Sequence, residues 1–118
     1  MGTFFHAITL LAASGTGSET VEGLVDTGST FTTVPAPVLE RLGVRPHRTV
    51  RLRLANGEVD ERRLGRVLAE LDGMQEEILC VFGGSDDLPT IGAHTLEAFL
   101  LAADPVEKRL VHVEAFWV

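Results

Sequence analysis

Turn signals recur along this chain at short intervals, and they limit the fold to one built mainly from short strands. Asn56-Gly57 and Asp72-Gly73 each separate two runs rich in Val, Leu, Arg or Glu, and such dipeptides favour tight hairpins because both residues tolerate positive φ. A longer turn at residues 14–18 joins two further apolar runs. The pattern predicts strands at residues 3–13, 20–25, 31–34, 49–55, 58–63, 65–71, 77–81 and 110–118.

Two helices interrupt the strands. A short one is predicted at residues 37–42, with Gly43 after it as a left-handed C-cap. A longer one is predicted at residues 93–102, where Asp104-Pro105 ends it. We therefore expect an all-β fold, mainly an antiparallel closed barrel with one or two short helices, formed by residues 1–118 as a single domain.

Composition excludes several classes of protein. The net charge of −7 and the lack of a dense basic stripe argue against nucleic acid or an anionic membrane as partner. Cys80 is the only cysteine, so it forms no intramolecular disulfide, and we expect it to be a small core residue. The apolar residues 4–13 are too few to span a bilayer, and no basic residue precedes Arg41, so we expect a buried strand in a cytoplasmic protein.

The segment from Gly23 to Thr30 carries the clearest chemical signal. An apolar strand ends there in Asp26, followed by Thr27, Gly28 and Ser29. The strand directs the carboxylate toward the core, the glycine permits a tight turn, and the two hydroxyls can hydrogen-bond the carboxylate or the chain beside it. Taken alone, the same four residues are also compatible with an ordinary surface turn after a strand.

The run Leu24-Val25-Asp26-Thr27-Gly28-Ser29 resembles the active-site loop of aspartic proteases. Three further elements are similar, in the same order, to those of retroviral-type proteases and their bacterial and archaeal relatives. They are a strand end at Thr33-Val34-Pro35, a flap hairpin about Asn56-Gly57, and a second apolar-apolar-glycine element at Thr90-Ile91-Gly92. The resemblance covers about residues 3–113 and implies a retropepsin-like acid protease fold.

Aspartic protease chemistry needs two adjacent carboxylates that share one proton. This chain has one Asp-Thr-Gly, because Asp72-Gly73 lies in a hairpin turn and Asp86-Asp87 in a polar loop. We therefore expect a homodimer in which the Asp26 carboxylates of both subunits meet. By the resemblance, Asp26, Thr27 and Gly28 are catalytic: the acids activate a water that attacks the peptide bond, with no metal and no cofactor.

The resemblance also implies the residues that bind a peptide or protein substrate: Ser29 and the flap-tip residues Ala55, Asn56 and Gly57. The Ser29 hydroxyl is expected to favour the ionised carboxylate, and hence to give the parent a more acidic pH optimum than a Ser29→Ala variant. The flap departs from the family pattern, because the chain has no tyrosine and the flap tip has a single glycine. The charged run at residues 60–63 predicts either a solvated edge strand or a flap that selects charged or polar peptide segments.

The last predicted strand, residues 110–118, becomes apolar on both faces toward its end. In the retroviral relatives the chain ends interleave across the dimer, so the resemblance implies that Phe116 and Trp117 are interface residues. Alternatively, Trp117 closes the core of its own chain.

Two other functions stay open. The same fold could serve as a catalytically inactive dimerisation or peptide-binding module, which the unusual flap favours and the intact Asp26–Ser29 motif opposes. The chain could also be a small β-barrel binding protein in which the motif is coincidental.

Overall fold

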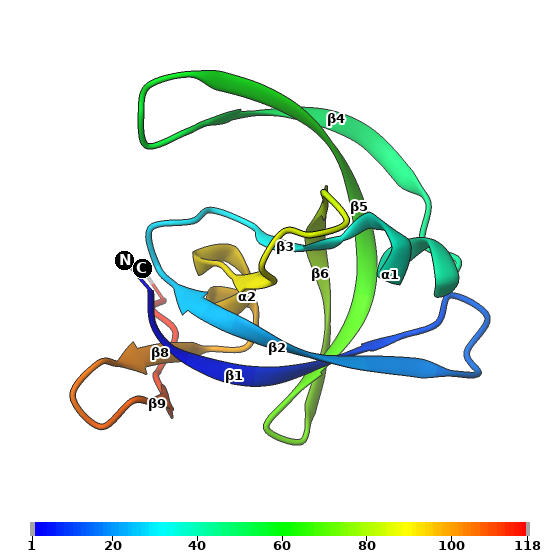
Figure 1. The fold of residues 1–118 in the computed structure, drawn as a ribbon. Helices are drawn as coiled ribbons and strands as arrows, with labels where there is room; N and C mark the ends of the chain where they lie inside the picture. Colours follow the sequence, from blue (N-terminus) through cyan, green and yellow to red (C-terminus); the bar gives the residue numbers. More distant parts are fainter. Residues whose placement is uncertain (1, 118) are drawn as a thin grey trace.

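The computed structural model describes residues 2–117, which form a mainly β fold with two short helices (Figure 1). The elements, in chain order, are β1 (Gly2–Leu11), β2 (Ser18–Asp26), β3 (Thr32–Pro35), α1 (Ala36–Arg41), β4 (Pro46–Arg53), β5 (Val59–Leu71), β6 (Met74–Gly83), β7 (Thr90–Ile91), α2 (Ala93–Ala98), β8 (Leu101–Asp104) and β9 (Arg109–His112).

Strands β1 to β7 form one sheet in the order β1-β2-β7-β3-β6-β5-β4, and β8 pairs with β9 in a separate hairpin. Strand β1 also pairs with β5, through Thr9↔Glu70 and Leu10↔Ala69. The pairings β2–β7 and β3–β6 are parallel, while the other described pairings are antiparallel. The expectation of a mainly antiparallel fold is confirmed, and the closed barrel stays a prediction.

The main core collects inward side chains of the strands other than β4, together with one face of each helix, and Val50 of β4 packs in a second cluster with Leu64 and Val81. Strand β5 shows the period of two that a half-buried strand requires: Val67, Ala69 and Leu71 are buried, whereas Leu68 is exposed and Glu70 is half-buried. Burial of such apolar side chains in the shared core is the main source of stability in such a fold.

The predicted boundaries at Gly65 and at the end of the second helix were wrong. The strands predicted at 58–63 and 65–71 are one continuous strand, β5, because Gly65 does not end it: a side chain there would meet Phe82, Val44 and the carbonyl of Arg45 at 3.0–3.1 Å. The helix predicted at 93–102 ends at Ala98, because Leu100 takes a left-handed φ of 55° and its carbonyl accepts a hydrogen bond from the Val113 N–H (2.9 Å).

The turn at Asn56-Gly57 also differs from the predicted two-residue form. Strand β4 ends at Arg53 and β5 begins at Val59, so the flap turn is longer. Among the described residues of this turn, Gly57 alone has a positive φ (90°), and the Asn56 side chain instead accepts a hydrogen bond from the Glu58 N–H (2.9 Å). The C-cap predicted for α1 is confirmed, with a φ of 76° at Gly43.

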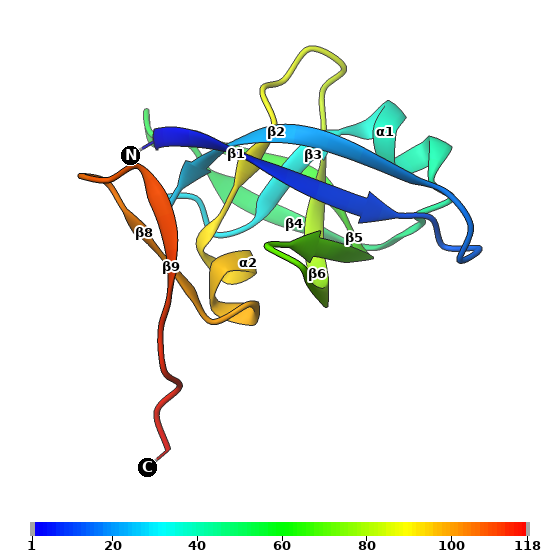
Figure 2. The same ribbon diagram turned by 90° about the horizontal axis from the view of Figure 1, so that it is seen from below.

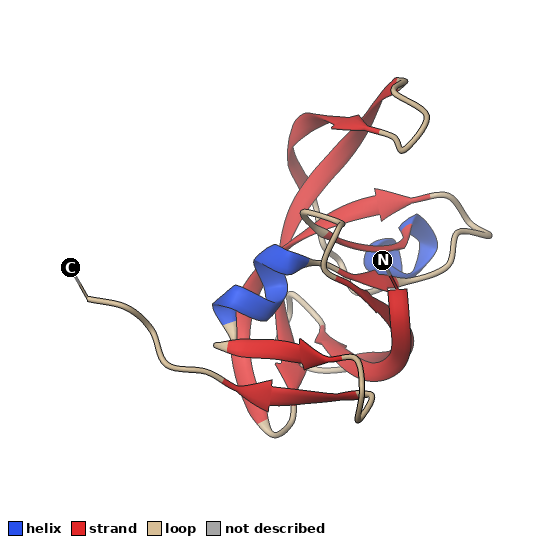
Figure 3. Ribbon diagram, turned by 90° about the vertical axis from the view of Figure 1, so that its left-hand side faces the viewer, coloured by secondary structure: helices blue, strands red, loops and turns tan. Residues whose placement is uncertain are grey.

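The last residues leave the sheet. Strand β9 ends at His112, and residues 113–117 run away from the body of the molecule without a strand partner (Figures 2 and 3). Phe116 and Trp117 are 98% and 97% exposed, so Trp117 does not close the core of its own chain. The predicted strand to residue 118 is thus too long, and Val118 itself lies outside the described residues.

Candidate active site

Asp26 is the last residue of β2, where that strand emerges from the core. The two residues before it pair in parallel with β7, Leu24 with Thr90 and Val25 with Ile91. Val25 and Ile91 are 1% and 0% exposed, whereas Asp26 is half-buried. The two apolar-apolar-glycine elements predicted from the sequence therefore lie side by side, and their buried side chains fix the point at which the carboxylate reaches the surface.

A tight turn orients the Asp26 carboxylate. The Gly28 N–H donates to Asp26 Oδ1 (2.9 Å), and the Ser29 N–H donates to the Asp26 carbonyl (3.1 Å). The pKa of the Asp26 carboxyl lies below its ordinary value: the chain's amino terminus is the largest cause, partial burial opposes it, and the Gly28 N–H and the Ser29 hydroxyl lower it further. This single-chain environment holds a carboxylate in its charged form.

The beginning of α2 holds the turn after Asp26 in place. The N–H groups of Ala93 and His94 donate to the carbonyls of Ser29 (2.8 Å) and Thr30 (2.9 Å). Gly92 makes this approach possible, because a Cβ at that position would lie 2.4 Å from the Phe31 carbonyl oxygen. The glycine of the second element is therefore required by close packing against the loop that carries the acid.

A buried pair of hydroxyls supports the contact between the beginning of α2 and the turn after Asp26. Thr32 Oγ1 and Thr95 Oγ1 are 2.6 Å apart, and the Gly92 N–H donates to Thr32 Oγ1 (3.1 Å). Both threonines are buried, at 1% and 0% exposure. Sequence reasoning missed this pair, since nothing local marks two threonines so far apart along the chain as partners.

The β4–β5 hairpin arches over the Asp26 turn as a flap (Figure 1). Between them lies a cleft of about 730 Å³. Its wall is formed by the turn after β2, by β3 and β6, and by the outer half of β4: Asp26, Gly28, Ser29, Thr30, Phe31, Thr33, Arg51, Leu52, Arg53, Leu54, Ala55 and Val81.

The structure brings together four of the seven predicted site residues in this cleft: Asp26, Gly28, Ser29 and Ala55. Asn56 and Gly57 lie at the tip of the flap, beyond the residues that line the cleft, and Thr27 is exposed outside it. Sequence reasoning missed Arg51, Leu52, Arg53 and Leu54 as residues that line the cleft, because within the flap it assigned substrate contact to the tip alone.

The remaining candidate groups lie apart from the cleft. Burial raises the pKa of the Cys80 thiol to about 12, which keeps the side chain uncharged and unreactive in the core. Across residues 2–117, no three His, Cys, Asp or Glu side chains gather to hold a metal ion. No helix within that range has the length and apolar character needed to cross a membrane.

Comparisons with known proteins agree with this geometry. A family model described as "Aspartyl protease" matches residues 12–75, which include Asp26 and the flap. Among solved structures, the simian foamy virus (mac) protease superposes with a TM-score of 0.53 at 16% identity, covering 78% of this chain and 92% of that one. No curated protein matches the chain.

A second structural match is the foamy viral protease-reverse transcriptase in complex with an RNA/DNA hybrid, with a TM-score of 0.57 at 12% identity. It covers 96% of this chain, which spans 13% of that larger protein. The family model extends over more than half of the sequence, and both structural matches share the fold. The chain therefore belongs to the aspartyl protease family and has the retropepsin-like fold of a retroviral protease.

Proposed function

We propose that this protein is a homodimeric aspartic endopeptidase in which Asp26 of each subunit supplies one of two catalytic carboxylates. The observation that carries the proposal is the position of Asp26: it is the only carboxylate among the residues lining the cleft beneath the flap. A single carboxyl group cannot be ionised to activate the water and protonated to polarise the carbonyl at the same moment, so a second copy supplies the other group.

The proposed reaction is general acid–base hydrolysis. When the two carboxylates meet, they share one proton, because two negative charges at that distance are not both stable. The ionised carboxylate takes a proton from a water molecule, which attacks the peptide carbonyl, and the protonated partner polarises the carbonyl oxygen. The protonated partner carboxyl then gives its proton to the leaving amine, and no covalent intermediate forms. Gly28 allows the substrate backbone to approach, while Ser29 and the flap residues Ala55, Asn56 and Gly57 contact the peptide.

Two features of the single chain support a dimer. Phe116 and Trp117 are almost fully exposed, and side chains of that size are ordinarily covered. Thr27, next to the acid, is exposed, and among residues 2–117 its side chain has no hydrogen bond of its own. We propose that both regions are buried against the partner subunit, with Thr27 bracing the opposite loop. The single-domain organisation of residues 1–118 and a cytoplasmic location stay predictions.

A cleavage assay with a matched control tests the proposal. We expect purified protein to cleave a peptide library between pH 3 and 7, to be inhibited by pepstatin, and to lose turnover in Asp26→Asn. Asp86→Asn makes the same change on an exposed loop and should leave cleavage intact. Sedimentation should show a dimer that Trp117→Ala weakens. Cleavage that survives Asp26→Asn, or full activity in a strictly monomeric sample, would refute the mechanism.

The second candidate is a catalytically inactive peptide-binding module of the same fold. The observation that favours it is the flap, which lacks the tyrosine and the glycine-rich tip of its relatives. Peptide binding without turnover, equal in the parent and in Asp26→Asn, would support this alternative over the protease.

A further inference from the structure

Half of the lysines and arginines of this acidic protein lie in one stretch of the chain, part of which borders the cleft. Residues 41–57 contain five arginines and no aspartate or glutamate, in a chain whose net charge is −7. This stretch leads into β4 and the flap turn, and β4 is the edge strand of the sheet. The cleft is therefore bordered by a strand whose charge is opposite to that of the molecule as a whole.

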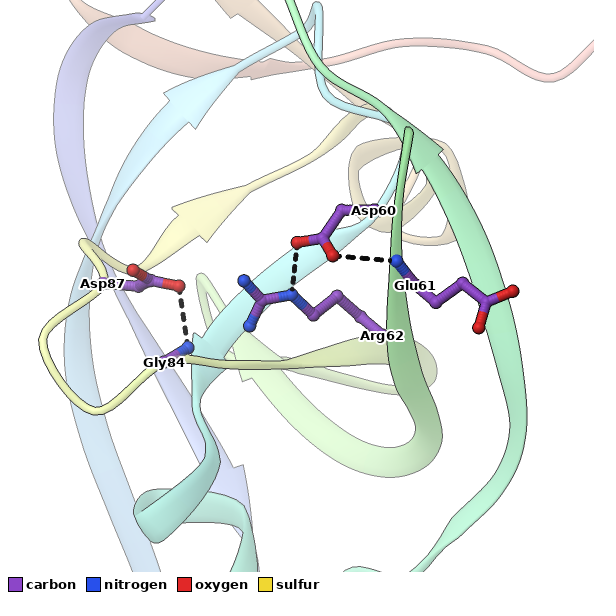
Figure 4. A network of polar contacts seen from close by, with 5 residues as sticks. All are labelled: Asp60, Glu61, Arg62, Gly84 and Asp87. Carbon is purple, nitrogen blue, oxygen red and sulfur yellow. Dashed lines mark hydrogen bonds and ion pairs between the residues drawn. The ribbon is translucent and has the colours of Figure 1, made fainter. Parts of the chain in front are cut away.

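Most of the neighbouring arginines are neutralised within the chain. Four lie within 4.0 Å of a carboxylate, as the pairs Arg41–Glu19, Arg62–Asp60, Arg63–Glu40 and Arg66–Glu77. Figure 4 shows Asp60 accepting hydrogen bonds from both the Arg62 guanidinium and the Glu61 N–H. The run at residues 60–63 therefore pairs largely with itself or with α1, which is the behaviour of a solvated edge rather than of a binding site.

Arg51 and Arg53 differ from these four arginines in their position and in their lack of a carboxylate partner within residues 2–117. Both line the cleft, and within residues 2–117 neither has a carboxylate at salt-bridge distance. Arg53 donates one hydrogen bond to the Gly57 carbonyl (3.0 Å), which leaves further N–H groups of its guanidinium to donate elsewhere. Arg48, on the same strand, has no carboxylate partner among residues 2–117 either, but it does not line the cleft.

We infer that Arg51 and Arg53 select peptides with acidic side chains close to the scissile bond. The inference rests on the proposed function, since it concerns the substrate of the same cleft. A guanidinium is the side chain best suited to pair with a carboxylate, because it can donate two parallel N–H bonds. Leu52 and Leu54 also line the cleft and offer apolar contact, and they alternate with the two arginines along the chain. In the homodimer, the two flaps place this pair of arginines on both sides of the cleaved bond.

The test uses three octapeptides with an apolar pair at the centre and Glu, Gln or Lys at the second position on either side. We expect kcat/KM to be about tenfold higher for the Glu than for the Gln peptide, and lowest for Lys, at low salt and pH 6. The advantage of Glu should shrink as ionic strength rises, and as pH falls below about 4 and the substrate carboxylates become protonated.

Matched variants assign the preference to its residues. Arg51→Gln and Arg53→Gln should each reduce the ratio of Glu to Gln peptide cleavage severalfold, and Arg51→Glu should favour the Lys peptide. Arg48→Gln removes the same charge from the same strand outside the cleft, and should leave the ratio unchanged. A preference for Glu that persists in both cleft variants would overturn the assignment.

Binding separates this inference from the proposed function. The same peptides, labelled with fluorescein, are titrated into Asp26→Asn protein and followed by anisotropy. If no peptide is cleaved, yet the Glu peptide binds more tightly than Gln and depends on Arg51, then the selectivity stands and the protease proposal fails. If the three peptides are cleaved equally and turnover depends on Asp26, the protease stands and the selectivity is wrong. Equal binding without turnover refutes both.

Discussion

Replacing Thr32 by valine tests whether the buried hydroxyl pair holds the active-site loop. The substitution keeps the shape of the side chain, so it opens no cavity, but it removes the partner of two buried groups: the Gly92 N–H and the Thr95 hydroxyl. Each buried polar group left without a partner costs about 1–3 kcal/mol. We therefore expect Thr32→Val to lower the free energy of unfolding by about 2 kcal/mol or more.

The chain offers a matched control on its surface. Thr9 and Thr20 form a similar hydroxyl pair (2.8 Å) in an exposed position, where water replaces a lost partner, so Thr9→Val should cost less than about 0.5 kcal/mol. Urea unfolding is followed by circular dichroism at fixed protein concentration, because dimerisation would otherwise shift the midpoint. Fluorescence is a poor probe, since the only tryptophan is 97% exposed.

A double-mutant cycle measures the interaction energy between Thr32 and Thr95. Thr32→Val/Thr95→Val leaves only the Gly92 N–H without a partner, so the double variant should be more stable than the sum of the single costs predicts, by about 1 kcal/mol. If Thr32→Val costs no more than Thr9→Val, the pair does not brace the loop and the reasoning fails.

Three further predictions follow from the described contacts. Gly92→Ala should destabilise the protein by about 3 kcal/mol or more in urea unfolding, whereas Gly84→Ala, whose added Cβ would meet only a side chain, should cost far less. Cys80 should resist iodoacetamide at pH 8 in the folded protein and react in urea, because its pKa is about 12 when buried; rapid native labelling would contradict this. Ser29→Ala removes a group that lowers the pKa of Asp26, so that pKa rises and the acidic limb of the kcat/KM profile moves to higher pH; identical profiles would refute the role of the hydroxyl.

Local sequence signals were enough to predict the features that depend on adjacent residues. The turn at Asp26–Ser29, the flap hairpin and the cap at Gly43 each rest on hydrogen bonds or φ values within a few residues. The wrong predictions concern residues whose backbone conformation depends on tertiary contacts. In the sequence, Gly65 is typical of a residue that ends a strand. It lies inside the long strand β5 because its missing side chain makes room for Phe82. Leu100 reads as part of a helix but turns the chain into β8.

The candidate site likewise contains residues that local sequence predicts and residues that only tertiary packing brings together. Asp26 could be found from its motif, since the strand, the acid and the glycine are consecutive. The Thr32–Thr95 pair could not, because the two residues meet only after β3 and α2 have packed together. The position of Arg51 and Arg53 on the cleft depends on how the flap curves over the Asp26 turn, and residue order alone does not encode that curvature.

The contact between the start of α2 and the turn after β2 has a consequence for biosynthesis. The groups that hold the Asp26 turn belong to Gly92, Ala93 and His94, more than sixty residues later in the chain, so the acid stays unplaced while that distant segment is still being translated. A nascent chain therefore carries its carboxylate in an unformed loop. The Asp26 turn can therefore reach its described geometry only after residues 92–94 have been synthesised and have packed against it.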